Sequence, residues 1–297
     1  MKWLISRYLL GAVVLSNVVL FFLARQSGWN LELVVLLGTL GSLALACGLE
    51  RVLPHDPCWG GMKADTATDL TSAAIIVAIV DPVLKYVGPV LAVGAWQLFG
   101  WSTPLGEWLT TQPYVPQMLA VIVSSELGRY WAHRWHHTHR WLWKLHAFHH
   151  SSERLYALNN FRFHPLNYLN NFVLGVFPLM LLGVPAEVML GYLAVSQPVL
   201  MLQHANLDLR SGWLNYIFST NEVHRWHHST VPAEANRNYG YALALWDHVF
   251  RTFHYVPSRN APHRIGLFAE SADYPAHDSY LAQVADAFKP GCCRLRG

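Results

Sequence analysis

Residues 133–153 read HRWHHTHRWLWKLHAFHHSSE, and the histidines of this stretch decide how the rest of the chain must fold. His133 and His137 are spaced as HxxxH. The cluster at His146, His149 and His150 has the pattern HxxHH, and so has the cluster far downstream at His224, His227 and His228. Histidine is the commonest metal ligand, and residues three or four apart share one face of a helix. Each cluster can therefore direct several imidazole rings toward one point, which predicts a metal site.

The number of histidines predicts two metal ions rather than one. Neighbours such as His149 and His150 point about 100° apart on a helix, so they suit two ions better than one. Eight or more imidazoles exceed what one four-coordinate zinc ion can use, whereas two five- or six-coordinate iron ions would use them. His204 in QHAN is a further expected ligand, because an unpaired imidazole at membrane depth is costly. His164 in RFHPLN precedes a proline and is either a ligand or a structural cap.

The composition indicates an integral membrane protein. Of the 297 residues, 53% are hydrophobic and 13% are charged, and the mean hydropathy is +0.21. Thirteen tryptophans fit a chain with long membrane–water boundaries. A net charge of +3 gives no support to nucleic-acid binding. The four cysteines have no CxxC spacing, so no disulfide framework is expected, and no pattern around the pair Cys292 and Cys293 supports lipidation or metal binding.

Two N-terminal stretches are predicted to cross the membrane. Residues 8–24 and 33–49 are apolar and uncharged, and each approaches the roughly 20 residues that span a bilayer. Residues 71–99 are also apolar, but Asp81, Pro82 and Lys85 interrupt them. We therefore expect a kinked or re-entrant helix in that stretch.

Further helices connect the membrane part to the histidines. A helix from about residue 115 is expected to leave the membrane near Glu126 and Arg129 and to continue into the first histidine cluster. Residues 166–182 and 188–202 then predict an apolar helical hairpin. This hairpin returns the chain to the side from which it entered, so both histidine-rich segments are expected on one membrane face.

The charge asymmetry predicts which face this is. Between residues 129 and 162 there are six basic residues and one acidic residue, whereas residues 100–112 contain no Lys or Arg. The histidine side is therefore predicted to be cytoplasmic. The expected fold is an all-α, polytopic transmembrane helical bundle with a cytoplasmic, histidine-rich dimetal cap. We divide the chain into N-terminal transmembrane helices (1–110), a catalytic domain (111–257) and a cytoplasmic C-terminal tail (258–297).

The ordered motifs of residues 115–253 resemble the fatty acid hydroxylase and sterol desaturase superfamily of membrane non-haem di-iron oxygenases. These motifs are HRWHHTHRWLWKLHAFHHSSE, RFHPLN, QHAN and HRWHHS. The resemblance implies a helical membrane bundle with a cytoplasmic metal-binding region. It also implies that two irons are held by His133, His137, His146, His149, His150, His224, His227 and His228, with His204 as a plausible further ligand.

A later element of the superfamily is matched by Asn238, Tyr239, Gly240, Trp246 and Asp247. The chain departs from that pattern twice. Asn236 stands where the superfamily usually has an aspartate, and Arg251 stands where a glycine is usual. The resemblance implies that these departures affect the orientation of the ligating rings and a local turn, and leave the metal ligands themselves in place.

The expected activity is oxidation of a lipid by dioxygen and two electrons, because members of the superfamily hydroxylate, desaturate or cleave lipids in this way. A sterol, a fatty acyl chain and an alkylglycerol ether all fit as substrate, and the sequence does not choose between hydroxylation and desaturation. The chain has no ferredoxin-type cysteines, dinucleotide-binding glycine motif or fused cytochrome domain, so we expect a separate electron-transfer protein. A zinc hydrolase is disfavoured because the HExxH motif is absent. The remaining alternative is a non-catalytic metal- or haem-binding membrane protein. Haem needs only two axial histidines, so the additional histidine clusters argue against a haem protein.

Other polar residues are expected around the metals. His136 and His139 break the spacing of the clusters, which favours a position at the surface or beside a ligating ring. Four side chains are candidates for hydrogen bonds that orient the rings: Glu153, Asn206, Asn238 and Asp247.

Overall fold

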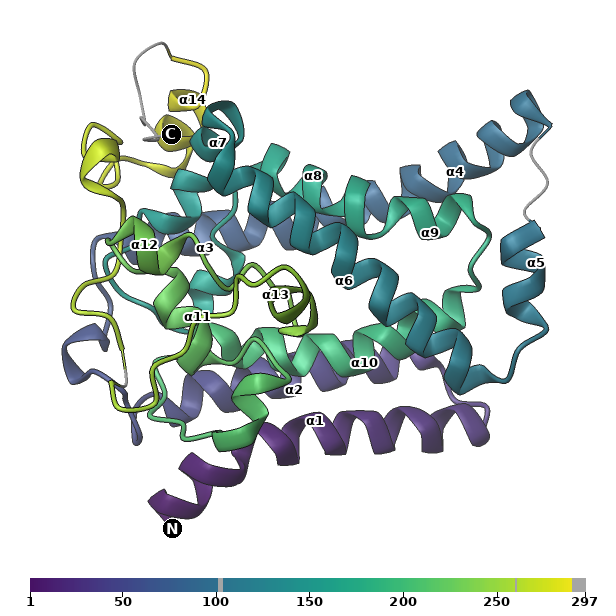
Figure 1. Ribbon diagram of the computed structural model, residues 1–297, viewed down its shortest axis with the longest axis horizontal. Helices are drawn as coiled ribbons and strands as arrows, with labels where there is room; N and C mark the ends of the chain where they lie inside the picture. Colours follow the sequence, from purple (N-terminus) through teal and green to yellow (C-terminus); the bar gives the residue numbers. More distant parts are fainter. Residues whose placement is uncertain (101–103, 260, 290–297) are drawn as a thin grey trace.

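The structure is a computed structural model that describes residues 1–100, 104–259 and 261–289. Its N-terminal hairpin consists of two apolar helices, α1 (Lys2–Gln26) and α2 (Leu31–Leu49) (Figure 1). The turn between them uses Gly28 at φ +67°, and the Asn30 side chain caps α2 by accepting from the Leu33 N–H. Both helices are long and apolar enough to cross a membrane. They contain the two spans expected from the sequence.

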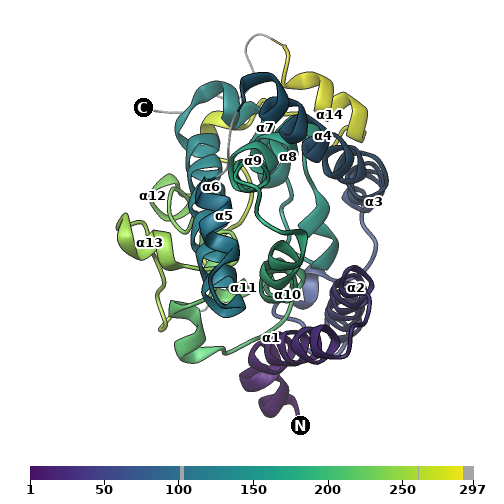
Figure 2. The ribbon, with the colours of Figure 1, turned by 90° about the vertical axis from the view of Figure 1, so that its right-hand side faces the viewer.

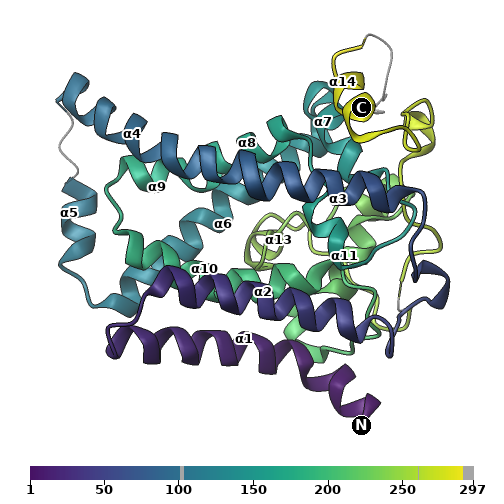
Figure 3. The same cartoon turned by 180° about the vertical axis from the view of Figure 1, so that it is seen from behind.

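The third apolar segment is a continuous helical run of 35 residues, Asp65–Phe99, which also meets the criteria for a membrane span. It consists of α3 (Asp65–Ile75), a π-helical turn, η2 (Ile76–Val80), and α4 (Asp81–Phe99). Pro82 lacks an N–H for the preceding turn, which accounts for the local change to π-helix. The segment expected to be kinked or re-entrant thus runs along the back of the bundle without turning back (Figure 3).

A second group of helices carries the chain between the bundle and the histidines. Helix α6 (Tyr114–Thr138) runs from the bundle directly into the first histidine cluster, as expected, and α7 (Arg140–His150) follows it. The expected apolar hairpin consists of α8 (Pro165–Gly175), α9 (Phe177–Leu181) and α10 (Ala186–Gln203), and α5 (Pro104–Thr110) lies at the far end of the bundle. A view along the bundle shows α3 above α2 on the same side of the bundle (Figure 2).

Short helices and loops close the histidine end of the bundle (Figure 1). They are α11 (Asn221–His227), α12 (Pro232–Ala235), α13 (Leu245–Val249) and α14 (Tyr280–Asp286), with 3-10 turns at η1 (Pro57–Trp59), η3 (Ala157–Phe161), η4 (Gly212–Tyr216) and η5 (Ala269–Ser271). Apart from two isolated bridges, the described residues form helices and loops without a strand, which confirms the all-α prediction for this part of the chain.

The C-terminal segment, which the sequence analysis assigned to a tail, packs against the histidine end. The Phe268 ring stacks on Trp143 at 4.8 Å between centroids, and the Tyr280 ring meets Phe148 edge-on at 5.4 Å. All four side chains are buried. This segment lacks regular periodicity because its aromatic residues come from loops and one short helix, so the sequence pattern did not reveal its packing. Cys292 and Cys293 lie outside the described residues.

Candidate metal centre

Nine buried or half-buried histidines form two adjacent groups at the cap end of the bundle. Within each group the potential ligand nitrogens all lie within 4.8 Å of one another. We call them group A and group B. Group A contains His133, His137, His146, His150 and His227, and group B contains His149, His204, His224 and His228.

The HxxHH motif at the end of α7 and the one at the end of α11 each supply both groups. His149 belongs to group B while its neighbour His150 belongs to group A, because successive side chains of α7 diverge around the helix axis. At the end of α11, His227 and His228 divide in the same way. The rings of His150 in group A and His228 in group B stack with their centroids 4.4 Å apart, so the two groups are in direct contact.

Backbone carbonyls fix the orientation of three rings. The Nδ1 atom of His133 lies 3.0 Å from the Tyr239 carbonyl oxygen, that of His149 lies 3.1 Å from the Arg162 carbonyl, and that of His227 lies 2.8 Å from the Arg237 carbonyl. A carbonyl oxygen can only accept a hydrogen bond, so Nδ1 must carry the proton in each ring. Each Nε2 then presents a bare lone pair, which is the form that binds a metal.

Amide oxygens of three asparagines face further rings. Nδ1 of His137 lies 3.2 Å from the Asn236 Oδ1, and Nδ1 of His146 lies 2.7 Å from the Asn167 Oδ1. The corresponding distance from His204 to Asn160 is 3.3 Å. These contacts give the same tautomer as the backbone carbonyls, with the proton on Nδ1 and the lone pair on Nε2.

Burial keeps the rings neutral. It lowers the pKa of His149 to about 3 and that of His227 to about 4. The pKa values of His150 and His228 also lie well below the usual range, again because of burial and next because of neighbouring histidines. The rings therefore carry no charge at neutral pH and are ready to bind a cation without first releasing a proton.

The spacing of the Nε2 atoms fits shared metal ions. In group B the Nε2 atoms of His204, His224 and His228 form a triangle with sides of 3.1–3.2 Å. Two nitrogens that each lie about 2.1 Å from one ion, at angles between 90° and tetrahedral, are about 3.0–3.4 Å apart. Three lone pairs at this separation repel one another unless a cation lies between them.

Group A gives the same indication in a different form. Its Nε2 atoms of His133 and His146 lie 3.1 Å apart. The Nε2 atoms of His137, His150 and His227 are buried with no hydrogen-bond partner. A buried polar atom without a partner is costly, so the donor set fits a metal ion in this group as well.

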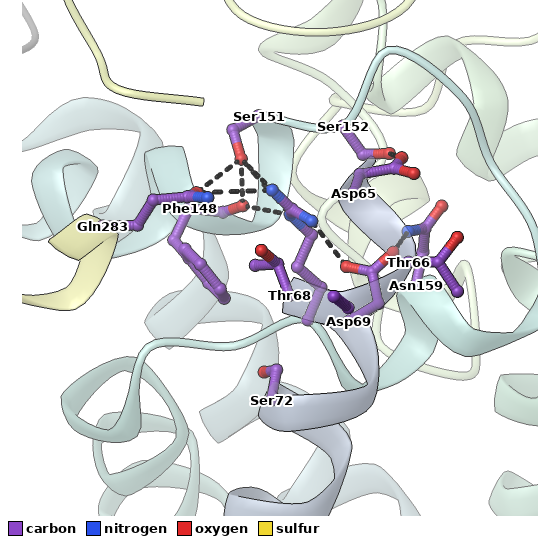
Figure 4. Close-up of polar contacts among 12 residues, drawn as sticks. Asp65, Thr66, Thr68, Asp69, Ser72, Phe148, Ser151, Ser152, Asn159 and Gln283 are labelled. Carbon is purple, nitrogen blue, oxygen red and sulfur yellow. Dashed lines mark hydrogen bonds and ion pairs between the residues drawn. The ribbon is translucent and has the colours of Figure 1, made fainter. Parts of the chain in front are cut away.

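A buried ion pair supports group B from outside. The guanidinium Nη1 of Arg162, whose backbone carbonyl accepts from His149, lies 2.5 Å from the carboxylate of Asp69 on α3, and both side chains are fully buried. Asp69 also accepts from Asn159, and the guanidinium donates to Ser151. Figure 4 shows these side chains around the pair, together with Gln283 from α14. The network joins α3, α7 and the C-terminal segment behind the His149 ring.

The nine histidines expected as ligands are those that the structure brings together, and the remaining candidates lie elsewhere. His164 belongs to neither group; its Nδ1 accepts from the Leu166 N–H, so it caps α8. His136 takes the second of the two expected positions, beside a ligating ring: it is buried, its ring centroid lies 5.2 Å from that of His146, and its Nδ1 lies 2.6 Å from the Ala132 carbonyl oxygen. His139 takes the first, because it is exposed.

Among the described hydrogen bonds, the four side chains expected to orient the rings do not contact a ring of either group. Glu153 is exposed, and Asn206 bonds to the backbone of Asp56. Asn238 bonds to the backbone around His254, and Asp247 accepts from the N–H groups of Tyr239 and Gly240. Asp247 therefore affects the His133 ring indirectly, because it holds the loop whose Tyr239 carbonyl orients that ring.

Of the residues that contact the rings, Asn236 was identified from the sequence as a position that affects ring orientation, and the others were missed for two reasons. Three ring partners are backbone carbonyls, which carry no sequence signal. Asn160 lies two residues before the RFHPLN motif, and Asn167 is the last residue of that motif, three residues after His164 on α8. Their amide side chains in an apolar segment are the one signal that could have identified them, because buried amides need partners.

The two departures from the superfamily pattern have visible consequences. Asn236 contacts His137 through an amide oxygen, so this ring faces a neutral acceptor instead of a carboxylate. Arg251 adopts φ +59°, in the left-handed region that favours glycine. The turn is thus retained at a cost in backbone strain, and its Thr252 still bonds to Asp247.

A large cavity leads from the bundle to both groups. Its volume is about 870 Å³, and its walls include His133 and His146 of group A and His149, His204 and His224 of group B. Most of the remaining wall is apolar and comes from α2, α3, η2 and α10. A long apolar molecule in this cavity would have one part against the histidines and the rest between the membrane helices.

Comparison with known proteins relates the chain to lipid-oxidising enzymes. Residues 118–252 match the family model for fatty acid hydroxylases. The chain is 36% identical over 258 residues to an ornithine lipid hydroxylase from Rhizobium tropici, which covers 86% of this chain and 75% of that protein. It is 28% identical over 161 residues to an alkylglycerol monooxygenase from Xenopus tropicalis and 31% identical over 131 residues to one from Danio rerio. These matches cover 54% and 44% of this chain, but only 32% and 29% of those two proteins. No solved structure matches the chain.

Proposed function

The chain belongs to the fatty acid hydroxylase family, and we propose that it is a membrane lipid hydroxylase whose nine histidines hold two iron ions, one in each group. The observation that carries this proposal is the apolar cavity that reaches both groups. Hydroxylation is favoured over desaturation because the relatives described above are a hydroxylase and monooxygenases. A polar membrane lipid is the expected substrate.

The metal supplies the activation of dioxygen, which is needed to oxidise an unactivated C–H bond and which no side chain can provide. The contribution of the chain is to hold neutral rings with their Nε2 lone pairs directed inward. The carbonyls of Tyr239, Arg162 and Arg237 keep these tautomers fixed. The apolar walls of the cavity exclude water from the reacting carbon and align the lipid beside the histidines.

The overall reaction needs two electrons in addition to dioxygen, since one oxygen atom enters the lipid and the other leaves as water. We propose that a separate protein delivers these electrons on the side of the cap. The excess of basic residues around the first two histidine clusters supports a cytoplasmic cap and a multi-pass topology. In this arrangement residues 111–257 form the catalytic unit, and residues 1–110 supply the cavity wall from α2 and α3.

The proposal is tested by metal analysis and isotope labelling together. Purified protein is expected to contain one iron for each histidine group, and cells that make it are expected to accumulate a lipid that has gained one oxygen atom from ¹⁸O₂. His149→Ala in group B and His227→Ala in group A should each abolish the product, while exposed His139→Ala should leave it unchanged. Product formation by metal-free protein, or a product without label, would contradict the proposal, and a haem absorption band would favour a cytochrome instead.

A further inference from the structure

An arginine lies in the wall of the cavity close to the metal centre. Arg129 on α6 lines the cavity together with His133, which follows one helical turn later. Residues four apart on a helix have their Cβ atoms about 5–6 Å apart on the same face. The Arg129 side chain is therefore a neighbour of group A on the side that faces the membrane bundle. The other charged side chains of the cavity wall are Glu32, Asp81 and Lys85. A cation at membrane depth is costly unless it is paired with a charged or polar group, so the partners of Arg129 matter.

The packing around Arg129 holds its side chain in one place. Gly175 on α8 leaves room for the methylene groups of the Arg129 side chain, since a Cβ atom on residue 175 would lie 2.4 Å from the Arg129 Cγ. The guanidinium carbon lies 4.1 Å from the centre of the Tyr241 ring, which also lines the cavity. The Nε atom donates to the Ser125 hydroxyl at 3.4 Å. Three neighbours thus position the guanidinium beside the cavity.

Within the described part of the chain, no carboxylate lies within ion-pair distance of Arg129. The nearest candidate in sequence, Glu126, accepts from the Tyr192 hydroxyl and from the N–H groups of Ala242 and Leu243. Its oxygens are therefore occupied. Of the five N–H donors of the guanidinium, only the one on Nε has a described protein acceptor.

The other carboxylate in this region of the cavity is also occupied. Asp81 on α4 pairs with Lys85 at 2.6 Å and accepts from the Tyr168 hydroxyl at 2.8 Å. Both Asp81 and Tyr168 line the cavity. The guanidinium of Arg129 thus faces a space lined mainly by apolar side chains and metal-site histidines, in which Asp81 is already paired with Lys85.

We propose that Arg129 is a binding subsite for an anionic oxygen group of the lipid substrate, an inference that rests on the proposed lipid hydroxylase function. The planar guanidinium matches a carboxylate or a phosphodiester through two parallel hydrogen bonds. Both groups carry one negative charge, and either would use the donors that have no described protein acceptor. The chemistry is the same whether the group is an amino-acid headgroup carboxylate or a lipid phosphate.

The position of Arg129 also determines which carbon is oxidised. An oxygen group held one helical turn from His133 leaves only a few bonds between itself and the carbon that meets the metal centre. Acyl chains would extend the other way, along the apolar walls formed by α2 and α10. The hydroxyl group is therefore introduced close to the anionic group and far from the chain terminus.

Lipid binding tests the subsite without requiring turnover. Purified holoprotein in detergent is titrated with N-palmitoyl ornithine (carboxylate), dipalmitoyl phosphatidylglycerol (phosphodiester) and 1-O-hexadecylglycerol (uncharged), and binding is followed from the rise in unfolding temperature. The wild type should bind at least one anionic lipid about 10- to 100-fold more tightly than the uncharged lipid, as expected for a charge-assisted hydrogen bond. The stronger of the two anionic lipids identifies the group.

Variants separate the subsite from general effects. Arg129→Gln should lose the preference for the anionic lipid, and Arg129→Lys should retain part of it. Arg25→Gln is the matched control, because Arg25 also stacks on a tyrosine ring, Tyr114 at 4.0 Å, but does not line the cavity. It should bind like the wild type. Iron content measured on each variant confirms that the metal centre is intact.

Two results would overturn the inference. The first is a wild type that binds the uncharged lipid as tightly as both anionic lipids, a result that does not depend on any variant. The second is a product whose new oxygen lies in the distal half of an acyl chain, as located by tandem mass spectrometry. If the wild type shows the Arg129-dependent preference but forms no oxygenated lipid, the hydroxylase function fails while the anion subsite stands.

Discussion

Replacing Asp69 by alanine should destabilise the fold more than any exposed charge substitution, because it leaves a buried arginine without its counter-ion. Asp69 and Arg162 have side chains that are 0% exposed and lie 2.5 Å apart. The carboxylate also accepts hydrogen bonds from Tyr156 and Asn159. Asp69→Ala therefore removes one charge and leaves three donors without this acceptor, namely those of the buried Arg162 and Asn159 and of the half-buried Tyr156.

The expected cost follows from this geometry. Removing one partner of a buried ion pair costs about 3–5 kcal/mol, mainly because the remaining charge is left without compensation. A folded domain has a total stability of about 5–15 kcal/mol, so the loss is a large fraction of it. The double variant Asp69→Leu/Arg162→Met removes both charges and should recover much of this loss, since apolar replacement of a buried pair is often neutral.

Stability can be measured by denaturant unfolding in mixed micelles, with Arg210→Ala as the control. Arg210 pairs with Asp208 at 3.2 Å, but its side chain is 51% exposed, so its loss should cost no more than about 1 kcal/mol. The reasoning is refuted if Asp69→Ala is as mild as this control, or if the double variant is less stable than Asp69→Ala alone.

Two further substitutions test helix packing and ring orientation. Gly128→Ala should separate α6 from α8 and lower the stability by at least about 1–3 kcal/mol, because the new Cβ would lie 1.9 Å from the Leu174 carbonyl oxygen. The control is Gly94→Ala, which has nothing within 4 Å of its new Cβ and should leave the unfolding temperature unchanged or raise it. Equal effects of the two substitutions would contradict this packing. Asn167→Leu removes the amide oxygen that lies 2.7 Å from His146 Nδ1. It should weaken metal binding about 10- to 100-fold, as measured by titration with a chelator. Unchanged metal binding would show that this contact does not orient the ring.

The histidine arrangement could be predicted because it follows from local helix geometry. In any α-helix, the HxxHH spacing directs the side chains of its first and last histidines to one side, and the side chain of the middle histidine points in a different direction. That is why His149 and His150 were expected to serve different ions, and why they belong to different groups. The gathering of both histidine segments at one end required only the apolar hairpin that ends at α10.

The partners of the rings could not be predicted because they depend on loop geometry. The carbonyls of Tyr239 and Arg237 reach their rings only because the chain between α12 and α13 folds back over α6 and α11. Asp247 was expected to contact a ring directly, yet it fixes this loop through two backbone N–H groups. A side chain that acts through a backbone contact has no distinctive spacing in the sequence.

In the proposed function, the metal-binding histidines and one wall of the substrate cavity come from different parts of the chain. All nine histidines of groups A and B lie within residues 118–252, the region matched by the family model. One wall of the cavity comes from α2, α3 and η2, which lie before this region. Arg129 stands where the two parts meet, one helical turn from His133 and facing the cavity. In the proposed function, sequence changes at the cavity-facing residues of α2 and η2 can therefore alter which lipid fits, whereas Asp69 of α3 supports the rings through its buried ion pair with Arg162.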